Sequence, residues 1–429
     1  MNGDQTCQSG GTGARALGGG AGYGTSRRRR SSGMVAAALL AIALTGCGGA
    51  SVSPSAKATA SRSAGPTATI RPTATATVRP TAQVEHGVFG PGGPMADGAS
   101  ATTATLLLDG RVLIGEEIGE ALQYGQPAVS PAELYDPTSG AFTQTGSMAH
   151  GRYYDAAVRL LDGRVLVAGG NDSTSLLKSA ELYDPATGKF SPTGSMLTAR
   201  EEFSATLLLD GRVLITGGLG DDGIYPLAAA ELYDPATGRF SPTGSMITAR
   251  ENSSVTRLLD GRVLIAGGDG YLLAYGELNF TPYASAELYD PRTGKFSATG
   301  SMTAPRTSHA ATLLGDGRVL VSGGLGPAPA VFEVGPYLDS AELFDPATGN
   351  FSPTGSMIAS AEEASATLLL DGRGLVMPTA ELYDPATGSF SLTGSGRAGP
   401  FSLAVRLLDG RVLVIENSIN ENGAEIYTP

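Results

Sequence analysis

Four arginines recur at matching positions along the chain, 48, 50 and 56 residues apart, and each precedes a glutamate in a repeated Ala-Glu-Leu segment. Four guanidinium groups on one face of a protein could clamp a carboxylate ligand through paired hydrogen bonds. The alternative, which we favour, is that the arginines form ion pairs with the glutamates that occur in the same repeats. The arginines are Arg152, Arg200, Arg250 and Arg306, and the glutamates are Glu181, Glu231, Glu287 and Glu342.

A second candidate is an acidic arc in the repeats that lack the arginine. Carboxylates without a basic residue at the matching position could attract a cation or a basic partner. The alternative is an acidic surface covered by water, and it is the commoner arrangement. The arc consists of Glu116, Glu117 and Glu416, with the repeated glutamates Glu133, Glu381 and Glu425 beside it.

Aromatic residues in two long segments outside the repeated motifs form the third candidate. Exposed aromatic rings suit contacts with carbohydrates and proteins, whereas the alternative is a small local cluster that packs over the edge of the domain. We place partner binding in the first of these segments, between Asp269 and Ser285. The candidate residues are Tyr271, Tyr275, Phe280 and Tyr283 in this segment and Phe332 and Tyr337 in the next repeat.

Motifs for catalysis or for a cofactor are missing from the sequence. It contains no nucleotide-binding loop, no HExxH or GxSxG motif and no paired metal-ligand spacing. His150 and His309 are isolated, and Cys7 and Cys47 both precede the repeats, which rules out a disulfide or a thiolate metal site within them. We predict no catalytic residue, no cofactor and no bound metal.

The elements that must position these candidates are repeated hairpins. An Asp-Gly-Arg turn joins two apolar runs, such as SATLLL and RVLIAGG, in every repeat. Asp-Gly favours a two-residue type I′ turn, which needs φ > 0 at both central positions. The two runs lack polar alternation, which predicts strands covered on both faces. The turns begin at Asp109, Asp162, Asp210, Asp260, Asp316, Asp371 and Asp409.

Two further strands follow in each repeat. AELYD and segments such as KFSPTG are joined by Pro-Ala-Thr-Gly, where proline presets φ and glycine supplies the left-handed position. The aromatic residues of these strands recur throughout, so we expect them in the core. The chain begins with a fourth strand and ends with a third, which predicts that residues near 87–95 complete the last sheet.

These four-stranded units are similar to kelch repeats, which form β-propellers. The similarity rests on the repeat length, on a Gly-Gly doublet after the second strand and on an aromatic residue in the fourth, where phenylalanine stands in place of the usual tryptophan. It implies an all-β fold, a seven-bladed β-propeller over residues 87–429 that the N-terminal strand closes.

The resemblance also bears on activity. Galactose oxidase resembles this fold, but its copper site needs two His, two Tyr and a Cys joined to a Tyr, and the repeats contain no Cys. Exported sugar epimerases of the kelch type give an alternative function, because Glu and Arg near a central opening would suffice for acid–base chemistry.

Targeting signals precede the repeats. RRRRSSGMVAAALLAIALTGC combines a charged run, a short apolar stretch and small residues, which predicts a signal peptide with an extended n-region over residues 1–46. Leu44-Thr45-Gly46-Cys47 resembles the bacterial lipobox, which implies a lipid on Cys47; an ordinary cleaved signal with a chance cysteine is the alternative. Residues 47–86, rich in Ala, Thr, Ser and Pro, are typical of an extended linker.

The overall charge limits the partners. The formal net charge is -12 and the pI is about 4.8, whereas a nucleic-acid partner normally requires a basic surface. Removal of residues 1–46 leaves 24 basic and 40 acidic residues, which gives -16. We therefore predict a monomeric, non-catalytic binding scaffold on the extracytoplasmic side of the cell membrane, held by its lipid anchor, with a protein or carbohydrate ligand. A sugar-modifying enzyme is the alternative.

Overall fold

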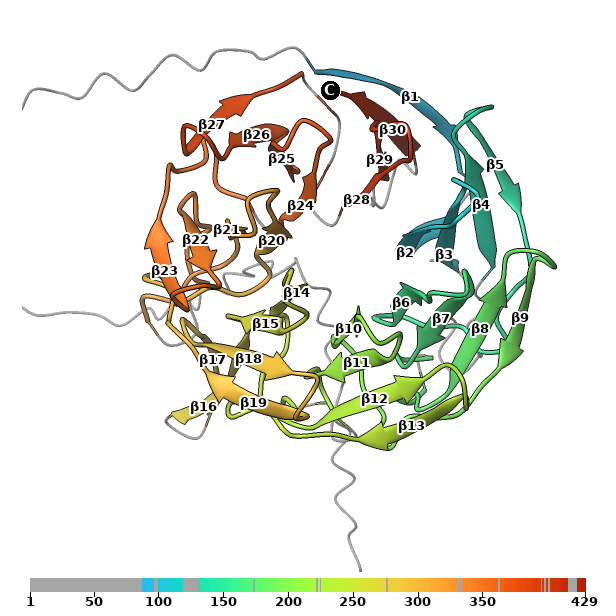
Figure 1. Ribbon diagram of the computed structural model, residues 1–429, viewed down its shortest axis with the longest axis horizontal. Coiled ribbons are helices and arrows are strands. Elements are labelled where there is room, and N and C mark those ends of the chain that lie inside the picture. Colours follow the sequence, from blue (N-terminus) through green and yellow to red (C-terminus); the bar gives the residue numbers. More distant parts are fainter. Residues whose placement is uncertain are drawn as a thin grey trace, which may run out of the picture. The chain divides into compact units, whose positions relative to one another are not determined.

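The computed structural model describes residues 87–95, 99–118, 131–172, 174–220, 223, 225–274, 277–330, 334–361, 363–394, 396, 399, 402–415 and 423–429. All of them belong to one compact unit, Thr77–Pro429. Seven antiparallel four-stranded sheets stand around a central axis like the blades of a propeller (Figure 1). This confirms the all-β, seven-bladed prediction. Among the described residues no helix is long and apolar enough to cross a membrane.

The two inner strands of each blade come from the apolar runs. The innermost strands are β2 (Ala99–Leu106), β6 (Ala156–Arg159), β10 (Ser204–Leu207), β14 (Ser254–Arg257), β20 (Ala310–Leu313), β24 (Ser365–Leu368) and β28 (Leu403–Arg406). The second strands are β3 (Val112–Ile118), β7 (Val165–Ala168), β11 (Val213–Thr216), β15 (Val263–Ala266), β21 (Val319–Ser322), β25 (Gly374–Met377) and β29 (Val412–Ile415).

The two outer strands come from the Ala-Glu-Leu and Phe segments. The third strands are β4 (Ala132–Asp136), β8 (Ala180–Asp184), β12 (Ala230–Asp234), β18 (Ala286–Asp290), β22 (Ala341–Asp345), β26 (Glu381–Asp384) and β30 (Gly423–Thr428). The outermost strands are β5 (Ala141–Gln144), β9 (Lys189–Pro192), β13 (Arg239–Pro242), β19 (Lys295–Ala298), β23 (Asn350–Pro353), β27 (Ser389–Leu392) and β1 (Val88–Pro94). We number the blades 1 to 7 by their innermost strands, from β2 to β28.

The ring closes as the sequence predicts. Strand β1 pairs with β30 in blade 7, with Phe89 opposite Tyr427. The innermost strands β28 and β2 are neighbours in space, like every other consecutive pair around the ring. Arg411 Nη2 donates to the carbonyl oxygen of Pro137 at 2.9 Å, which ties blade 7 to blade 1. Both ends of the propeller sequence therefore meet in one blade.

The Asp-Gly turns differ from the predicted type I′ geometry. In blade 3 the N–H of Leu208 donates to Arg212 O and the N–H of Gly211 donates to Leu208 O, so the loop has three residues. Only Gly211 has a positive φ, at +88°. A side-chain oxygen of Asp210 accepts the N–H of Arg212 at 3.1 Å, and this bond holds the turn while Asp210 stays out of the left-handed region. The arrangement is that of a three-residue hairpin with a glycine bulge.

The core lies between the blades. The second strands are buried throughout, as predicted, whereas the innermost strands are half-buried, which the sequence pattern did not predict. In every blade an aromatic residue of the third strand packs against the Phe of the outermost strand, with ring centroids 4.8–4.9 Å apart. The Tyr233 hydroxyl also reaches Thr193 of the preceding blade at 2.8 Å. These recurring aromatic residues are core, as expected.

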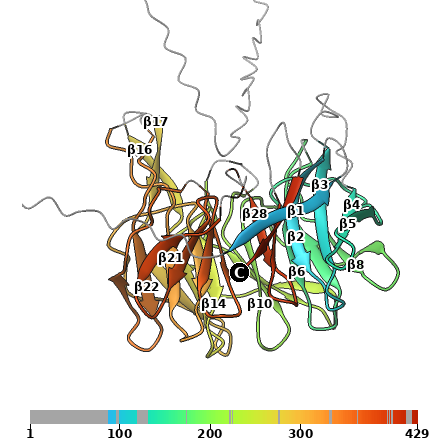
Figure 2. The same cartoon turned by 90° about the horizontal axis from the view of Figure 1, so that it is seen from above.

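Alternating strand directions give the propeller two different faces. The turn face carries the Asp-Gly turns and the Pro-Ala-Thr-Gly turns, which are nearly identical in each blade. The variable face carries the connections from the second to the third strand and from the outermost strand to the next blade. In blade 4 the first of these connections forms its own hairpin, β16 (Asp269–Ala274) and β17 (Glu277–Pro282). Figure 2 shows this hairpin rising at one face of the ring.

Candidate functional site

The repeated arginines are buried in the connections between blades. Arg200 Nη2 lies 2.9 Å from Glu231 Oε1, and its Nη1 donates to the carbonyl oxygens of Gly217 and Ala229. The same carboxylate accepts the N–H groups of Leu197 and Thr198. The other pairs, Arg152–Glu181, Arg250–Glu287 and Arg306–Glu342, have N–O distances of 3.0, 3.0 and 3.4 Å.

This burial argues against the hypothesis that the four arginines clamp a carboxylate ligand. The four arginines are 0–1% exposed, so a ligand at the surface does not reach their guanidinium groups. The ion-pair alternative is the one that the structure supports. Their position also explains the Gly-Gly doublet, since a Cβ at Gly217 would lie 2.5 Å from the carbonyl oxygen of Arg250 in the next blade.

Backbone strain marks the same connections two residues after the arginine position. Five non-glycine residues there have φ between +46° and +54°, a region that such residues rarely adopt. Strained backbone of this kind gathers at functional sites, and it was not predictable from the sequence because the five residues are of four different types. They are Tyr154, Glu202, Asn252, Ser308 and Glu363.

Hydrogen bonds join the strained residues of neighbouring blades. The N–H of Glu202 donates to Tyr154 O at 3.3 Å, and the N–H of Ser308 donates to Asn252 O at 3.2 Å. The Asn252 side chain donates to Glu202 Oε2 at 3.3 Å. Because each connection leads directly into an innermost strand, these residues surround the axis at the variable face.

Two carboxyl groups lie together at this end of blade 4. Glu251 and Asp269 exchange backbone hydrogen bonds of 3.1 and 3.0 Å, and both residues are buried. Thr307 donates its hydroxyl to Asp269 Oδ1 at 2.5 Å. Burial raises the pKa of Asp269 to about 7, and the nearby Glu202 carboxylate acts in the same direction. The Asp269 carboxyl can therefore hold its proton close to neutral pH.

Two more titratable groups lie in the same connections. Burial raises the pKa of Asp155 to about 6, although the nearby Arg152 opposes the shift. Burial lowers the pKa of His309 to about 3, and the charge of Arg306 adds to this effect. His309 Nε2 lies 2.9 Å from the hydroxyl of Ser254, so this imidazole is a neutral, buried hydrogen-bonding group. His150, by contrast, is exposed.

The predicted aromatic residues fall into three environments. Tyr271 and Phe280 are half-buried partners across the β16–β17 hairpin. Tyr283 packs under the hairpin, with the guanidinium carbon of Arg250 5.5 Å from its ring centroid. Tyr337 is exposed on the connection of blade 5. Tyr275 and Phe332 lie outside the described residues.

The acidic arc is only partly described. Glu116 and Glu117 belong to β3, opposite Ala101 and Ser100, but their side chains are outside the described part of the structure. Glu416 lies outside it as well, as do Cys47 and the whole of residues 1–86. Glu381 is buried and accepts the N–H groups of Ile358 and Ala359, which is a framework contact like that of Glu231.

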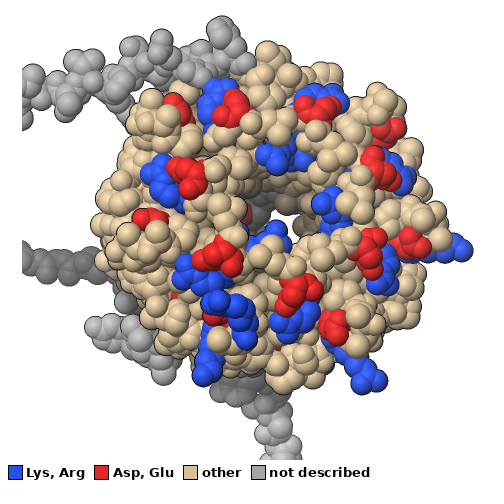
Figure 3. Space-filling model, in the orientation of Figure 1, with Lys and Arg blue, Asp and Glu red and all other residues tan. Residues whose placement is uncertain are grey.

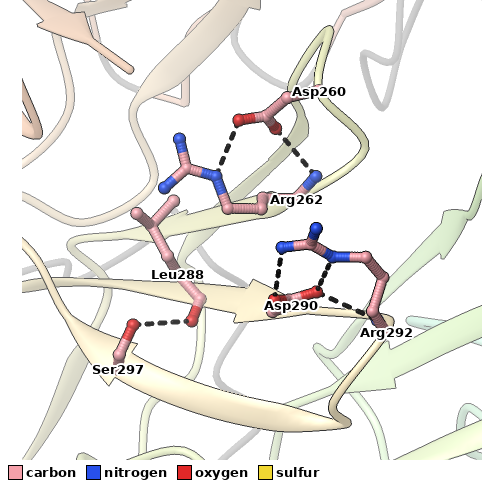
Figure 4. Close-up of a pocket in the computed structure, with 6 residues that line it drawn as sticks. All are labelled: Asp260, Arg262, Leu288, Asp290, Arg292 and Ser297. Carbon is pink, nitrogen blue, oxygen red and sulfur yellow. Dashed lines mark hydrogen bonds and ion pairs between the residues drawn. The ribbon is translucent and has the colours of Figure 1, made fainter. Parts of the chain in front are cut away.

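A pocket of about 520 Å3 lies on the turn face of blade 4 (Figure 4). Asp260 and Arg262 pair across it at 2.7 Å, and Asp290 and Arg292 pair at 3.0 Å. Asp-Arg pairs of the first kind recur in all blades, so this pocket is a feature of the repeat. Its charges neutralise one another, and we do not take it as the site.

Comparison with known proteins agrees with this architecture. The family model described as "Kelch motif" matches residues 152–197, which span blade 2. The chain carries a kelch motif. No match was found among curated proteins. Among solved structures, a fungal alcohol oxidase described as having catalytic diversity in the AA5 family and as being in complex with copper has a similar fold. Its TM-score is 0.62 at 17% identity, over 81% of this chain and 76% of that one.

Among the described residues of the propeller, no group of three or more His, Cys, Asp or Glu is arranged to hold a metal ion. Of the two histidines described, His309 is buried within a connection and His150 is exposed. The likeness to the alcohol oxidase is therefore one of fold, and we derive no copper chemistry from it.

Proposed function

We propose that this kelch propeller is a non-catalytic binding scaffold, tethered outside the membrane through a lipid on Cys47, that takes a protein or glycan ligand on its variable face. The β16–β17 hairpin carries the proposal. It is an insertion with strands of its own, it stands on the face where the connections differ, and it adds the facing pair Tyr271 and Phe280. Binding energy tends to concentrate in a few such aromatic anchors.

The strained connections beside the hairpin support the same face. Their polar groups, including the half-buried Glu201 and Glu202, lie next to the axis, whereas the hairpin lies at the rim of the same face. A ligand that spans from hairpin to axis would meet aromatic surface first and acidic groups further in. This combination suits a sugar with hydroxyl donors or a protein segment with basic and aromatic residues.

Binding can be tested with the full chain in detergent. A glycan array and a pull-down from envelope extract identify the ligand class, and titration then gives the affinity. Tyr271→Ala and Phe280→Ala should each weaken binding by roughly tenfold or more, which is about 1.4 kcal/mol. Arg292→Ala is the control, because its side chain is exposed on the turn face of the same blade. Loss of binding in the control, with none in the hairpin variants, would place the site on the turn face.

The second candidate is a sugar-modifying enzyme that uses the Glu251 and Asp269 pair for acid–base chemistry. A carboxyl with a pKa of about 7 suits that task, and this observation favours the candidate. We rank it second because both residues are at most 2% exposed, which separates them from a substrate. Turnover of sugar substrates by the wild type, abolished in Asp269→Asn, would reverse the ranking.

A further inference from the structure

Three arginines line the central opening at the end opposite the strained connections. Arg159, Arg257 and Arg406 are the last residues of the innermost strands β6, β14 and β28. They stand in blades 2, 4 and 7, so they are two, three and two blades apart around the ring. Figure 3 shows basic side chains bordering the central opening, inside a ring of paired acidic and basic groups.

Their hydrogen bonds hold the guanidinium groups along the wall of the opening. Each donates Nη1 to the carbonyl oxygen of the last residue in the preceding blade's innermost strand, at 2.7–2.8 Å. The acceptors are Leu106, Leu207 and Leu368. These bonds fix the orientation and use one of the five donors that a guanidinium group carries.

Unlike the arginines of the Asp-Gly-Arg turns on this face, the three have no acidic partner in the described part of the chain. Each Arg of the seven Asp-Gly-Arg turns pairs with its own Asp, at 2.6–2.8 Å. No ion pair joins Arg159, Arg257 or Arg406 to any described carboxylate. The opening therefore concentrates uncompensated positive charge in a protein whose net charge is -12.

An apolar ring surrounds this positive charge. Each of the three arginines is followed two residues later by an exposed leucine, and six blades carry a leucine at that position, with 61–70% of its surface exposed. Each leucine lies against the turn glycine of the next blade, for example Leu161 against Gly211, so the ring is continuous except at Gly315 in blade 5. The leucines are Leu108, Leu161, Leu209, Leu259, Leu370 and Leu408.

We propose that the opening on the turn face binds a free amphiphilic anion, a carboxylate or phosphate monoester with an apolar tail. Arg159, Arg257 and Arg406 would bind the anionic group with their remaining donors, and the leucine ring would cover the tail. A flat anionic membrane is a poorer match, because the seven Asp carboxylates outside the ring remain 41–49% exposed and would face its charge.

The test is calorimetric titration of the full chain with decanoate and decyl phosphate, below their micelle concentrations and at constant ionic strength. Saturable binding is expected for both, and acetate and inorganic phosphate should bind much more weakly. Arg159→Gln, Arg257→Gln and Arg406→Gln should each reduce the affinity roughly tenfold. Arg292→Gln on the same face is the control and should bind as the wild type does.

The apolar part is tested separately. Leu161→Ser with Leu408→Ser should weaken decanoate binding and leave acetate binding unchanged, and melting curves check that each variant is folded. Three outcomes would each overturn the proposal. They are wild-type affinity in a variant that combines the three arginine substitutions, the absence of saturable binding of either probe, and binding to anionic vesicles alone. Tyr271→Ala should keep the affinity, because this site is independent of the proposed one on the variable face.

Discussion

At the scale of single residues, the raised pKa of Asp269 predicts a pH-dependent stability. The pKa of Asp269 rises from 3.8 to about 7 in the fold. The folded protein then keeps a proton that the unfolded chain releases, so stability falls as the pH rises from about 4 to about 7. Asparagine cannot ionise and still accepts from Thr307. In thermal melting, the melting temperature of Asp269→Asn relative to that of the wild type should be higher at pH 8 than at pH 4.

Asp210 on the turn face provides a control, because its pKa is shifted in the opposite direction. Partial burial acts to raise the pKa of Asp210, but the hydrogen bonds from Arg212 hold it below its ordinary value. A lowered pKa stabilises the fold above about pH 4 and loses that effect as the pH falls. Asp210→Asn should therefore lose a little stability at pH 8. Parallel pH profiles of Asp269→Asn and the wild type would contradict the raised pKa of Asp269.

The buried Arg–Glu pairs predict a large difference between two arginine substitutions. Arg200→Met leaves Glu231 buried without its cation, and breaking such a pair costs about 3–5 kcal/mol. Arg292→Met breaks an exposed pair, which costs at most about 1 kcal/mol. Denaturant unfolding of both variants measures the difference. Equal losses would mean that the framework does not depend on the buried pairs.

Residue types predict some of these contacts and not others. The arginine and glutamate pairs follow from their joint occurrence in the repeats. The pair of Glu251 and Asp269 does not. The two residues belong to different motifs, and they meet only because the connection that carries Glu251 forms a β-bridge with Asp269, which follows the Gly-Gly doublet. Arg159, Arg257 and Arg406 were also missed, since they stand inside apolar runs where a strand was the only expectation.

At the scale of elements, strand β1 predicts the effect of an N-terminal truncation. It completes blade 7 by pairing with β30, and Phe89 packs on Tyr427 with ring centroids 4.9 Å apart. A chain starting at residue 100 loses this strand and leaves β30 with an open edge, so it should melt at a lower temperature and aggregate. A chain starting at residue 87 is the control. Unchanged melting and solubility of the shorter chain would refute the closure.

The strands were predictable from the sequence, but two of their details were not. The repeated motifs specify four strands and their order, because the apolar runs and turn residues recur in register. The turn type was mistaken, because the side chain of Asp210 stabilises a bulged loop that the Asp-Gly pair alone does not reveal. The β16–β17 hairpin occurs only once, so no repeat pattern pointed to its strands.

At the scale of the whole molecule, the ring gives the two ends of its axis opposite character. The variable-face end collects carboxyl groups, including Glu201, Glu202 and the pair in blade 4. The turn-face end collects Arg159, Arg257 and Arg406. Seven similar blades produce this difference because antiparallel strands bring all connections of one kind to one face. A few substitutions in the repeat are then enough to give the two faces opposite charge, which is the basis of the two proposed binding surfaces.

The proposed membrane anchor, which belongs to this scale, gives the last prediction. Leu44-Thr45-Gly46-Cys47 follows a short apolar stretch, so we propose that processing leaves Cys47 as the lipid-bearing first residue. A lipid chain with its many buried CH₂ groups, at about 0.8 kcal/mol each, should draw the protein into a detergent phase. Cys47→Ser should stay in the aqueous phase. Mass spectrometry of the N-terminal peptide checks the modification, and a wild type that partitions into water would disprove it.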